Sequence, residues 1–303
     1  MTQDMRGKRV VITGANSGLG FESVRALAAA GATVIMACRN AQKAQAAVDK
    51  VLAETPGADV SVRTLDLASL ASIKAFADGM KSDFTSIDVL LNNAGLMAIP
   101  RTLTADGFEM QLGTNHMGHF ALTGQLLGLL EASPAPRVVN VASTAHRMGK
   151  FDFDDLMGER HYGAWSAYGQ SKLANLAFTY ELERRLRAAG KRTIVLAAHP
   201  GYASTELQGV APKMEGSAFK GWIMNLGNNL LGQSAARGAI PQLHAVTSPD
   251  VKGGEYYGPD GLMEMWGAAA KRCTPTAAAL DKASHTRLWD MSVGLTGVDF
   301  GGL

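Results

Sequence analysis

The chain has 303 residues, 47% of them hydrophobic, and a net charge of +2. This length and composition predict one globular domain spanning 1–303, and a near-neutral charge without runs of like charge argues against a nucleic-acid partner. Since the apolar stretches are shorter than the ~20 residues that cross a bilayer and the N-terminus lacks signal-peptide form, we expect a cytoplasmic protein without a membrane span.

A glycine-rich turn between a strand and a helix opens the chain. Residues 8–13 predict a short buried strand, and apolar residues recur at helical spacing over 21–28 before a second strand at 33–38. The glycines of the motif at 14–20, Gly-Ala-Asn-Ser-Gly-Leu-Gly, allow a tight turn and let a pyrophosphate approach backbone N–H groups at the helix N-terminus. This βαβ unit therefore predicts a dinucleotide-binding site.

The rest of the chain continues the alternation of strands and helices. Further strands are predicted at 60–65, 87–91, 137–142, 193–198 and, as a short seventh, 254–258. The pattern predicts an α/β fold, a single-domain Rossmann-type doubly wound structure with a seven-stranded, mostly parallel sheet covered on both faces. The segment 203–232 breaks the alternation, because large apolar residues there are separated by glycines, and its simplest interpretation is a helix pair packed on the surface.

The end of the second strand bears on the choice of cofactor. Cys38 stands where an NAD enzyme normally carries a carboxylate that accepts hydrogen bonds from the ribose, and Arg39-Asn40 follow it. A carboxylate would repel a 2′-phosphate, whereas a guanidinium can bind one bidentately. The sequence therefore favours NADP(H), with the alternative that Arg39 stacks on the adenine or faces solvent.

Tyr168 and Lys172 lie four residues apart in a segment predicted to be helical, which places both on one face about one turn apart. A positive charge beside the phenol should lower its pKa from the usual ~10 toward neutrality, so that it can exchange protons at physiological pH. The pattern alone is weak, because a half-buried tyrosine beside a solvated lysine has the same spacing.

In combination these motifs resemble the short-chain dehydrogenase/reductase family over most of the chain. The same order holds further matching residues: Asn93-Ala94-Gly95 after the fourth strand, Asn115, Ser143 after the fifth strand, Pro200-Gly201 and Thr205. The 24 residues between Ser143 and Tyr168, with the segments 37–40, 115–120 and 168–175, resemble the retinol-dehydrogenase branch, which includes WW-domain oxidoreductases and protochlorophyllide reductases.

The resemblance implies hydride transfer between NADP(H) and a carbonyl or alcohol group of a small apolar substrate. Tyr168 would be the general acid/base, Ser143 would hydrogen-bond the substrate oxygen, Lys172 would hold the nicotinamide ribose, and Asn115 would link Lys172 to solvent through a water. The cofactor-binding residues that it implies are Gly14, Asn16, Ser17, Gly18, Leu19, Gly20, Arg39, Asn40, Asp66, Leu67, Asn93, Ala94, Gly95, Tyr168, Lys172, Pro200, Gly201 and Thr205. Asp66 could instead cap the next helix, although Ser69 is the better cap.

The resemblance also bears on the segment 203–232, which we expect to form a small lid over the substrate. The helical segments around 104–131 and 165–189 correspond to those that pair subunits in many family members, so a homo-oligomer is a possible assembly. By position His199 lies nearest the nicotinamide.

Two other functions remain as alternatives. A catalytically idle NADP(H)-binding scaffold or redox sensor would typically lack the tyrosine or the lysine, and an epimerase or dehydratase would have different glycine spacing and a longer domain. No metal is expected, because five of the seven histidines, at 116, 119, 146, 161 and 199, form no ligand cluster with plausible spacing. Cys38 and Cys273 are too few for a disulfide framework.

Overall fold

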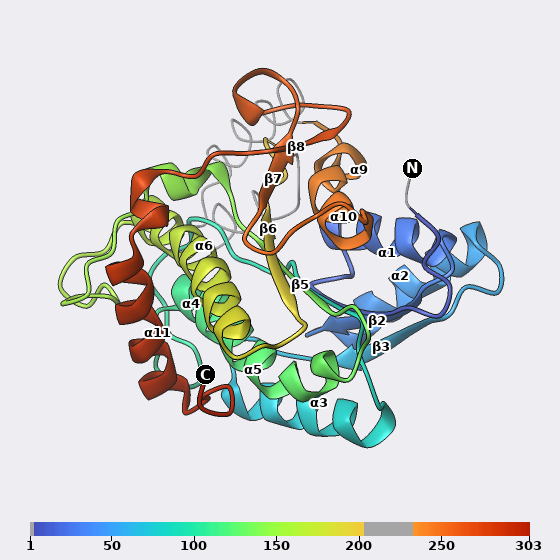
Figure 1. The fold of residues 1–303 in the computed structure, drawn as a ribbon, viewed down its shortest axis with the longest axis horizontal. Helices are drawn as coiled ribbons and strands as arrows, with labels where there is room; N and C mark the ends of the chain where they lie inside the picture. The colour runs from blue at the N-terminus through green and yellow to red at the C-terminus, as the bar shows by residue number, and fades with distance from the viewer. Residues whose placement is uncertain (1–2, 203–232) are drawn as a thin grey trace.

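The structure is a computed structural model that describes residues 3–202 and 233–303. One sheet forms its middle layer, with helices on both faces (Figure 1). The strands are β1 (Arg9–Thr13), β2 (Thr33–Cys38), β3 (Val60–Thr64), β4 (Val89–Asn92), β5 (Arg137–Val141), β6 (Ile194–Ala198), β7 (Tyr256–Pro259) and β8 (Ala270–Arg272). The predicted lid at 203–232, including Thr205, lies outside the described residues.

The α-helices in the described ranges are α1 (Gly18–Ala29), α2 (Ala41–Glu54), α3 (Leu70–Asp83), α4 (Met110–Leu112), α5 (Gly118–Glu131), α6 (Ala164–Ala188), α9 (Ala235–Gly238), α10 (Ile240–Thr247) and α11 (Lys282–Thr296). A π-helix, η1 (Gly113–Met117), joins α4 to α5, and short 3-10 helices are η2 (Thr144–Met148), η4 (Leu262–Glu264) and η5 (Ala277–Leu280). None of these helices is both long and apolar enough to cross a bilayer.

The strand order is β3-β2-β1-β4-β5-β6-β7-β8, with β1 to β7 parallel and β8 antiparallel to β7. This confirms the doubly wound class, and the order reverses between β1 and β4, where such sheets bind ligands beyond their carboxyl ends. The prediction of seven strands is one short. The eighth consists of only Ala270, Lys271 and Arg272, which lack an apolar run and pair with the edge strand β7.

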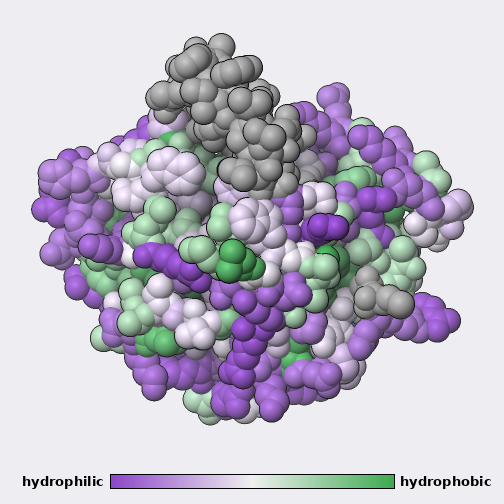
Figure 2. Space-filling model, turned by 90° about the horizontal axis from the view of Figure 1, so that it is seen from above, coloured by the Kyte–Doolittle hydropathy of each residue, from purple (hydrophilic) through white to green (hydrophobic). Residues whose placement is uncertain are grey.

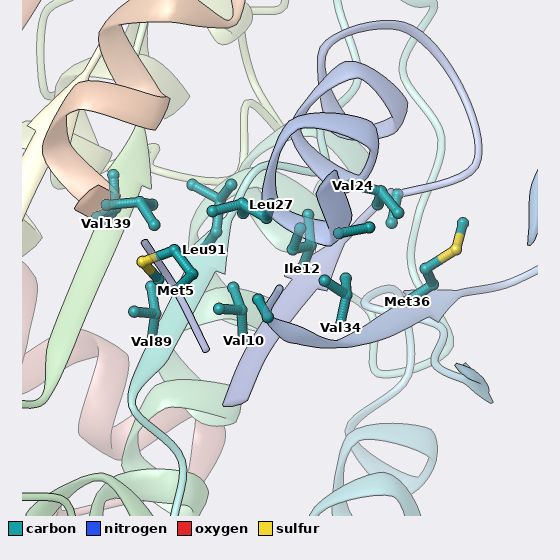
Figure 3. Close-up of a cluster of buried hydrophobic side chains, with 14 of the residues drawn as sticks. Met5, Val10, Ile12, Val24, Leu27, Val34, Met36, Val89, Leu91 and Val139 are labelled. Carbon is teal, nitrogen blue, oxygen red and sulfur yellow. The ribbon is translucent and has the colours of Figure 1, made fainter. Parts of the chain in front are cut away.

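The sheet is buried on both faces, which explains its nearly continuous apolar strands. Val10 and Ile12 of β1 point to one face and pack with Val24 and Leu27 of α1 (Figure 3). Val11 points to the other face, into a cluster built by α3, α5 and α6. The surface seen in Figure 2 carries hydrophilic residues along much of its outline, with smaller hydrophobic groups between them.

The helical segment predicted around 104–131 begins later than expected. Thr104, Asp106 and Gly107 belong to a tight turn in which the Gly107 N–H donates to the Thr104 carbonyl. The helix starts at Met110 because the Glu109 carboxylate accepts the first-turn N–H groups of Gln111 and Leu112 at 2.9 and 2.7 Å.

The C-terminal helix α11 lies against α6 (Figure 1). Trp289 of α11 and Phe300 beyond it form an aromatic cluster with Phe120 of α5 and Phe178 of α6, the Phe120–Phe300 centroids being 4.8 Å apart. The chain's own C-terminal segment thus covers part of α5 and α6, the two segments that family resemblance implied for subunit pairing. The oligomeric state stays a prediction, which sedimentation equilibrium can test.

Candidate active site

The glycine-rich turn lies at the carboxyl end of β1 and leads into α1. Gly14 has φ 62°, a left-handed conformation that favours glycine. Ser17 is the N-cap residue of α1, but its side chain makes no capping hydrogen bond. The first-turn N–H groups are therefore not satisfied by the cap, which suits an anion such as a pyrophosphate. Asn16 and Ser17 are partly exposed beside them, whereas Leu19 is buried.

Gly20 occupies the tightest position of this turn. A Cβ atom there would lie 2.6 Å from Asn93 Nδ2 and still closer to the Gly14 carbonyl oxygen, neither of which can move freely. We expect Gly20→Ala to cost roughly 1–3 kcal/mol of unfolding free energy and to weaken dinucleotide binding. Denaturant unfolding and cofactor titration measure both effects.

Gly128→Ala is a matched control for this prediction. Gly128 lies on the exposed face of α5 with nothing within 4 Å of its Cβ position, so alanine should stabilise that helix by up to about 1 kcal/mol. If the Gly20→Ala protein is as stable as the Gly128→Ala protein and binds the cofactor as tightly, the turn can accommodate a Cβ atom at position 20 and the prediction is wrong.

Thr13 ties the turn to the loop after β4. Its Oγ1 accepts the backbone N–H groups of Asn93 and Ala94, each at 2.9 Å. The Asn93 side chain returns a bond from Nδ2 to the Thr13 carbonyl at 2.9 Å and accepts one from Gln242 at 3.2 Å. Asn93 and Ala94, predicted as cofactor residues, therefore hold two loops together at the switch point of the sheet.

Cys38 and Arg39 occupy the carboxyl end of β2. The buried Cys38 sulfur accepts hydrogen bonds from the backbone N–H groups of Ala15 and Asn16, and burial raises the pKa of its thiol. Cys38 thus links the glycine-rich turn to β2. Arg39 is exposed, and its guanidinium makes no hydrogen bond or ion pair with the other described residues. Asn40 caps α2, accepting the Lys43 N–H at 2.8 Å.

Asp66 and Leu67 follow β3 at the same edge of the sheet. Ser69 is the N-cap of α3, as preferred from sequence, and its Oγ accepts the Ser72 N–H at 3.2 Å. Asp66 instead accepts the Ala68 N–H at 3.0 Å in a local turn. Leu67 is buried with its carbonyl against Gly118 at the start of α5, so Asp66 is the member of the pair with exposed surface.

Tyr168 and Ser143 meet beyond β5. Ser143 begins η2, its Oγ accepting the Ala145 N–H at 3.2 Å, and Tyr168 lies buried in the first turns of α6. Burial raises the pKa of Tyr168 above its usual value, and the hydrogen bond with the Ser143 side chain acts in the opposite direction. The geometry brings the two predicted catalytic hydroxyls together.

Lys172 lies one helical turn after Tyr168 and is also buried. Its Nζ donates to the Val141 carbonyl at 3.0 Å and lies 5.9 Å from the centroid of the Tyr168 ring. Burial lowers the pKa of Lys172 to about 8. The pKa of Tyr168 is raised instead of lowered as expected, because desolvation of the buried phenolate is the largest effect on it.

The lowered pKa of Lys172 gives a testable stability effect. Its folded-state value of about 8 lies below the ordinary 10.5, so between these values the unfolded chain binds more protons than the folded protein. Wild type should therefore gain stability relative to Lys172→Met as pH rises from 8 to 9.5, by at most about 1.4 kcal/mol per pH unit. Urea unfolding at several pH values measures this gap, and a gap that widens in favour of the variant would contradict the buried ammonium.

Asn115 sits in the π-helix η1 and holds the loop after β4. Its Oδ1 accepts the Leu96 N–H at 2.7 Å, and its Nδ2 donates to the Leu96 carbonyl at 2.9 Å and to Ser171 Oγ at 2.8 Å. A Cβ atom at Gly95 would lie 3.1 Å from Asn115 Oδ1 and 3.4 Å from Lys172 Nζ. The side chains of Asn115 and Lys172 therefore both lie close to Gly95 at the crevice.

Pro200 and Gly201 lie beyond β6 on the other side of the crevice. Gly201 has φ 66°, and the Pro200 carbonyl accepts a bond from Gln233 at 2.6 Å. The Gly201 N–H donates to His199 Nδ1 at 3.2 Å, so the buried His199 ring orients this loop.

His199 also meets Glu264 and Cys273, three groups close enough to hold a metal ion, which the sequence did not predict because they are distant in the chain. His199 Nε2 lies 3.4 Å from Glu264 Oε2 and 3.7 Å from Cys273 Sγ. Because Nδ1 accepts the Gly201 N–H, a neutral ring carries its proton on Nε2, facing Glu264. Arg147 pairs with Glu264 at 2.8 Å, and burial raises the pKa of the Cys273 thiol to about 12. Among the described residues the three groups thus form a hydrogen-bonded cluster beside Arg147.

Sequence reasoning missed several polar residues that support the site. Thr13, Ser171 and His119 bond to predicted site residues, and Asn175 shares the Val141 carbonyl with Lys172 at 3.1 Å. Ser171 and Asn175 were visible as polar residues on the Tyr168 face of α6. Thr13 and His119 carry no such signal, because they are 106 positions apart in the chain.

The fold and this crevice define an oxidoreductase, and the chain belongs to the short-chain dehydrogenase family, whose sequence model matches residues 8–216. Retinol dehydrogenase 13 of Homo sapiens is 41% identical over 296 residues, which cover 97% of this chain and 86% of that protein. Retinol dehydrogenase 12 of Mus musculus is 39% identical, covering 97% of this chain and 88% of that protein. These relatives confirm the predicted resemblance to the retinol-dehydrogenase branch.

Solved structures agree on the fold. An uncharacterized protein from Mycobacterium paratuberculosis is 42% identical with a TM-score of 0.80, covering 99% of this chain and 97% of that one. A short chain dehydrogenase from Shigella flexneri, complexed with NADP, is 22% identical with a TM-score of 0.64, covering 84% of this chain and 98% of that one. The second likeness supports the fold alone.

Proposed function

We propose that the protein is an NADP(H)-dependent oxidoreductase that interconverts a carbonyl and an alcohol on a small apolar substrate. The observation that carries the proposal is the buried Tyr168 hydroxyl bonded to the Ser143 side chain, with the Lys172 ammonium one helical turn away. Few purely structural roles require a buried lysine, because desolvating its charge is costly. Three groups able to move or stabilise a proton thus meet beyond the carboxyl end of β5.

The crevice residues fit a dinucleotide. The N–H groups at the start of α1 suit its pyrophosphate, and no residue in the described part of the chain pairs with the Arg39 guanidinium. Bound there, the cofactor would supply or accept the hydride. Lys172 would turn from the Val141 carbonyl to the ribose hydroxyls, and the Arg39 guanidinium would bind a 2′-phosphate.

The protein's own groups would then handle the proton. The Tyr168 hydroxyl donates to the substrate oxygen in the reducing direction and takes a proton back in the oxidising direction, while Ser143 Oγ hydrogen-bonds that oxygen. Because burial raises the Tyr168 pKa, the phenol stays protonated near neutral pH, which suits reduction. Asn115 and Lys172 would connect the site to solvent.

The relatives named retinol dehydrogenases make a retinoid the first substrate to test. We expect NADPH absorbance at 340 nm to fall with all-trans-retinal or a medium-chain aldehyde such as nonanal, and more slowly with NADH. NADPH binding without turnover of any compound in an aldehyde and ketone panel would instead favour the alternative function, a catalytically idle NADP(H)-binding scaffold or redox sensor.

A further inference from the structure

His119 of α5 is a buried side chain that joins the two halves of the crevice. Its Nε2 lies 2.9 Å from Thr13 Oγ1 at the end of β1, and its Nδ1 lies 3.0 Å from the Asn115 carbonyl in η1. The residue is 2% exposed, so water does not compete for either contact. Both ring nitrogens therefore bond to parts of the site that lie far apart in sequence.

The surrounding hydrogen bonds settle which nitrogen of the ring carries the proton. A threonine hydroxyl donates one hydrogen bond and accepts two. Thr13 Oγ1 accepts from the N–H groups of Asn93 and Ala94, and its own proton points to His119 Nε2 because its other acceptor, the Leu91 carbonyl, is at 3.5 Å. Nε2 is thus the acceptor, and Nδ1 carries the hydrogen that is donated to the Asn115 carbonyl.

This arrangement closes a circuit of bonds around the loop after β4. Thr13 holds the loop at Asn93 and Ala94, and the Asn115 side chain holds it again at both polar groups of Leu96. The His119 ring fixes the distance between these two anchors. Between them lies Gly95, where a Cβ atom would crowd Asn115 Oδ1 at 3.1 Å and Lys172 Nζ at 3.4 Å, so a shift of either anchor would change the spacing at that point.

We infer that His119 is a positioning residue, which in its neutral Nδ1–H form sets the spacing between the loop at 93–96 and the Asn115 carbonyl. The inference rests on the proposed function, since it assigns the loop to the nicotinamide side of the crevice. Burial lowers the pKa of His119 to about 4, against the hydrogen bond to Asn115. The ring acts by orientation and exchanges no proton during turnover.

Two substitutions separate the two bonds of the ring. An asparagine amide reaches about as far from the backbone as Nδ1, and a glutamine amide about as far as Nε2, so His119→Asn keeps the bond to Asn115 and His119→Gln keeps the bond to Thr13. His119→Asn frees the loop, and we expect its Kd for NADPH to rise roughly tenfold. His119→Gln frees the Asn115 carbonyl, so kcat should fall roughly tenfold with Kd within about twofold.

His116→Asn is the matched control, because His116 is equally buried in the same helical turn but bonds to Ser292 of α11 at 2.9 Å. Its substitution should lower Tm and leave Kd and kcat near wild type. If both His119 variants also show a lower Tm with Kd and kcat unchanged, the ring is a packing residue and the inference is wrong. The reverse result, a lower kcat in His119→Asn and a higher Kd for NADPH in His119→Gln, would equally overturn it.

A spectroscopic measurement covers the case in which the variants do not fold. Ring ¹⁵N chemical shifts of wild type at pH 7 should show His119 protonated at Nδ1 and bare at Nε2, and a proton at Nε2 would overturn the inference. If wild type binds NADPH but turns over no aldehyde, the proposed function fails alone, because the tautomer and the NADPH affinity of the asparagine variant still test His119.

Discussion

Tyr168→Phe should lower the turnover of an aldehyde by about 10²–10⁴-fold while the Kd for NADPH stays near wild type. The substitution removes only the hydroxyl that bonds to Ser143 at the proposed position of the substrate oxygen. The buried ring keeps its packing, and the phosphate-binding N–H groups of α1 are untouched. Initial rates at 340 nm and a fluorescence titration with NADPH measure the two quantities.

Tyr180→Phe provides the matched control in the same helix, because Tyr180 stacks on His285 away from the crevice. It should keep the wild-type rate. Lys172→Ala, by contrast, should reduce both turnover and NADPH affinity, since Lys172 serves the ribose as well as the proton path. If Tyr168→Phe kept most of its activity with a verified substrate, another group would have to be the proton donor.

Arg39→Ala should remove most of a preference for NADPH over NADH. A charged hydrogen bond to a 2′-phosphate changes affinity roughly tenfold to a hundredfold. Arg39 is exposed, and no residue in the described ranges pairs with its guanidinium, so it is available to bind the phosphate. The ratio of the two dissociation constants should fall toward one in the variant, mainly because NADPH binding weakens. Titration of both cofactors against both proteins measures this ratio.

Arg192→Ala is the control for general charge effects. Arg192 precedes β6, at the amino end of the sheet and away from the crevice, and its guanidinium donates to the Glu131 carbonyl. It should leave the cofactor ratio unchanged. Equal wild-type affinity for NADPH and NADH would contradict the assignment of Arg39 to a 2′-phosphate and would leave it to stack on the adenine or face solvent.

The fold could be predicted from sequence where local patterns carry the information. The buried parallel strands appear as apolar runs, and the Gly14 and Gly20 positions reflect a turn with no room for side chains. The three-residue edge strand β8 has no such run and forms only by pairing with β7. The late start of α4 depends on the Glu109 carboxylate bonding to its first turn, which helical periodicity cannot reveal.

The sequence could predict the places of the motif residues in the fold but not the contacts that their side chains make. Tyr168, Lys172 and Asn115 lie at the crevice because their motifs fix their places on α6 and η1. The pKa of Tyr168 depends on burial by the whole fold, so the four-residue spacing suggested a shift in the wrong direction. His119 and His199 acquire their partners only through tertiary contacts with residues distant in sequence.

Transfer of deuterium from [4-²H]NADPH to a carbonyl substrate tests the central claim most directly. Wild type incubated with labelled cofactor and all-trans-retinal or nonanal should give an alcohol carrying one deuterium on the former carbonyl carbon. Transfer should occur with one stereoisomer of the label and should nearly disappear in Tyr168→Phe. Saturating NADPH binding with no deuterium in any product of the aldehyde and ketone panel would contradict the assignment as an oxidoreductase of carbonyl and alcohol groups.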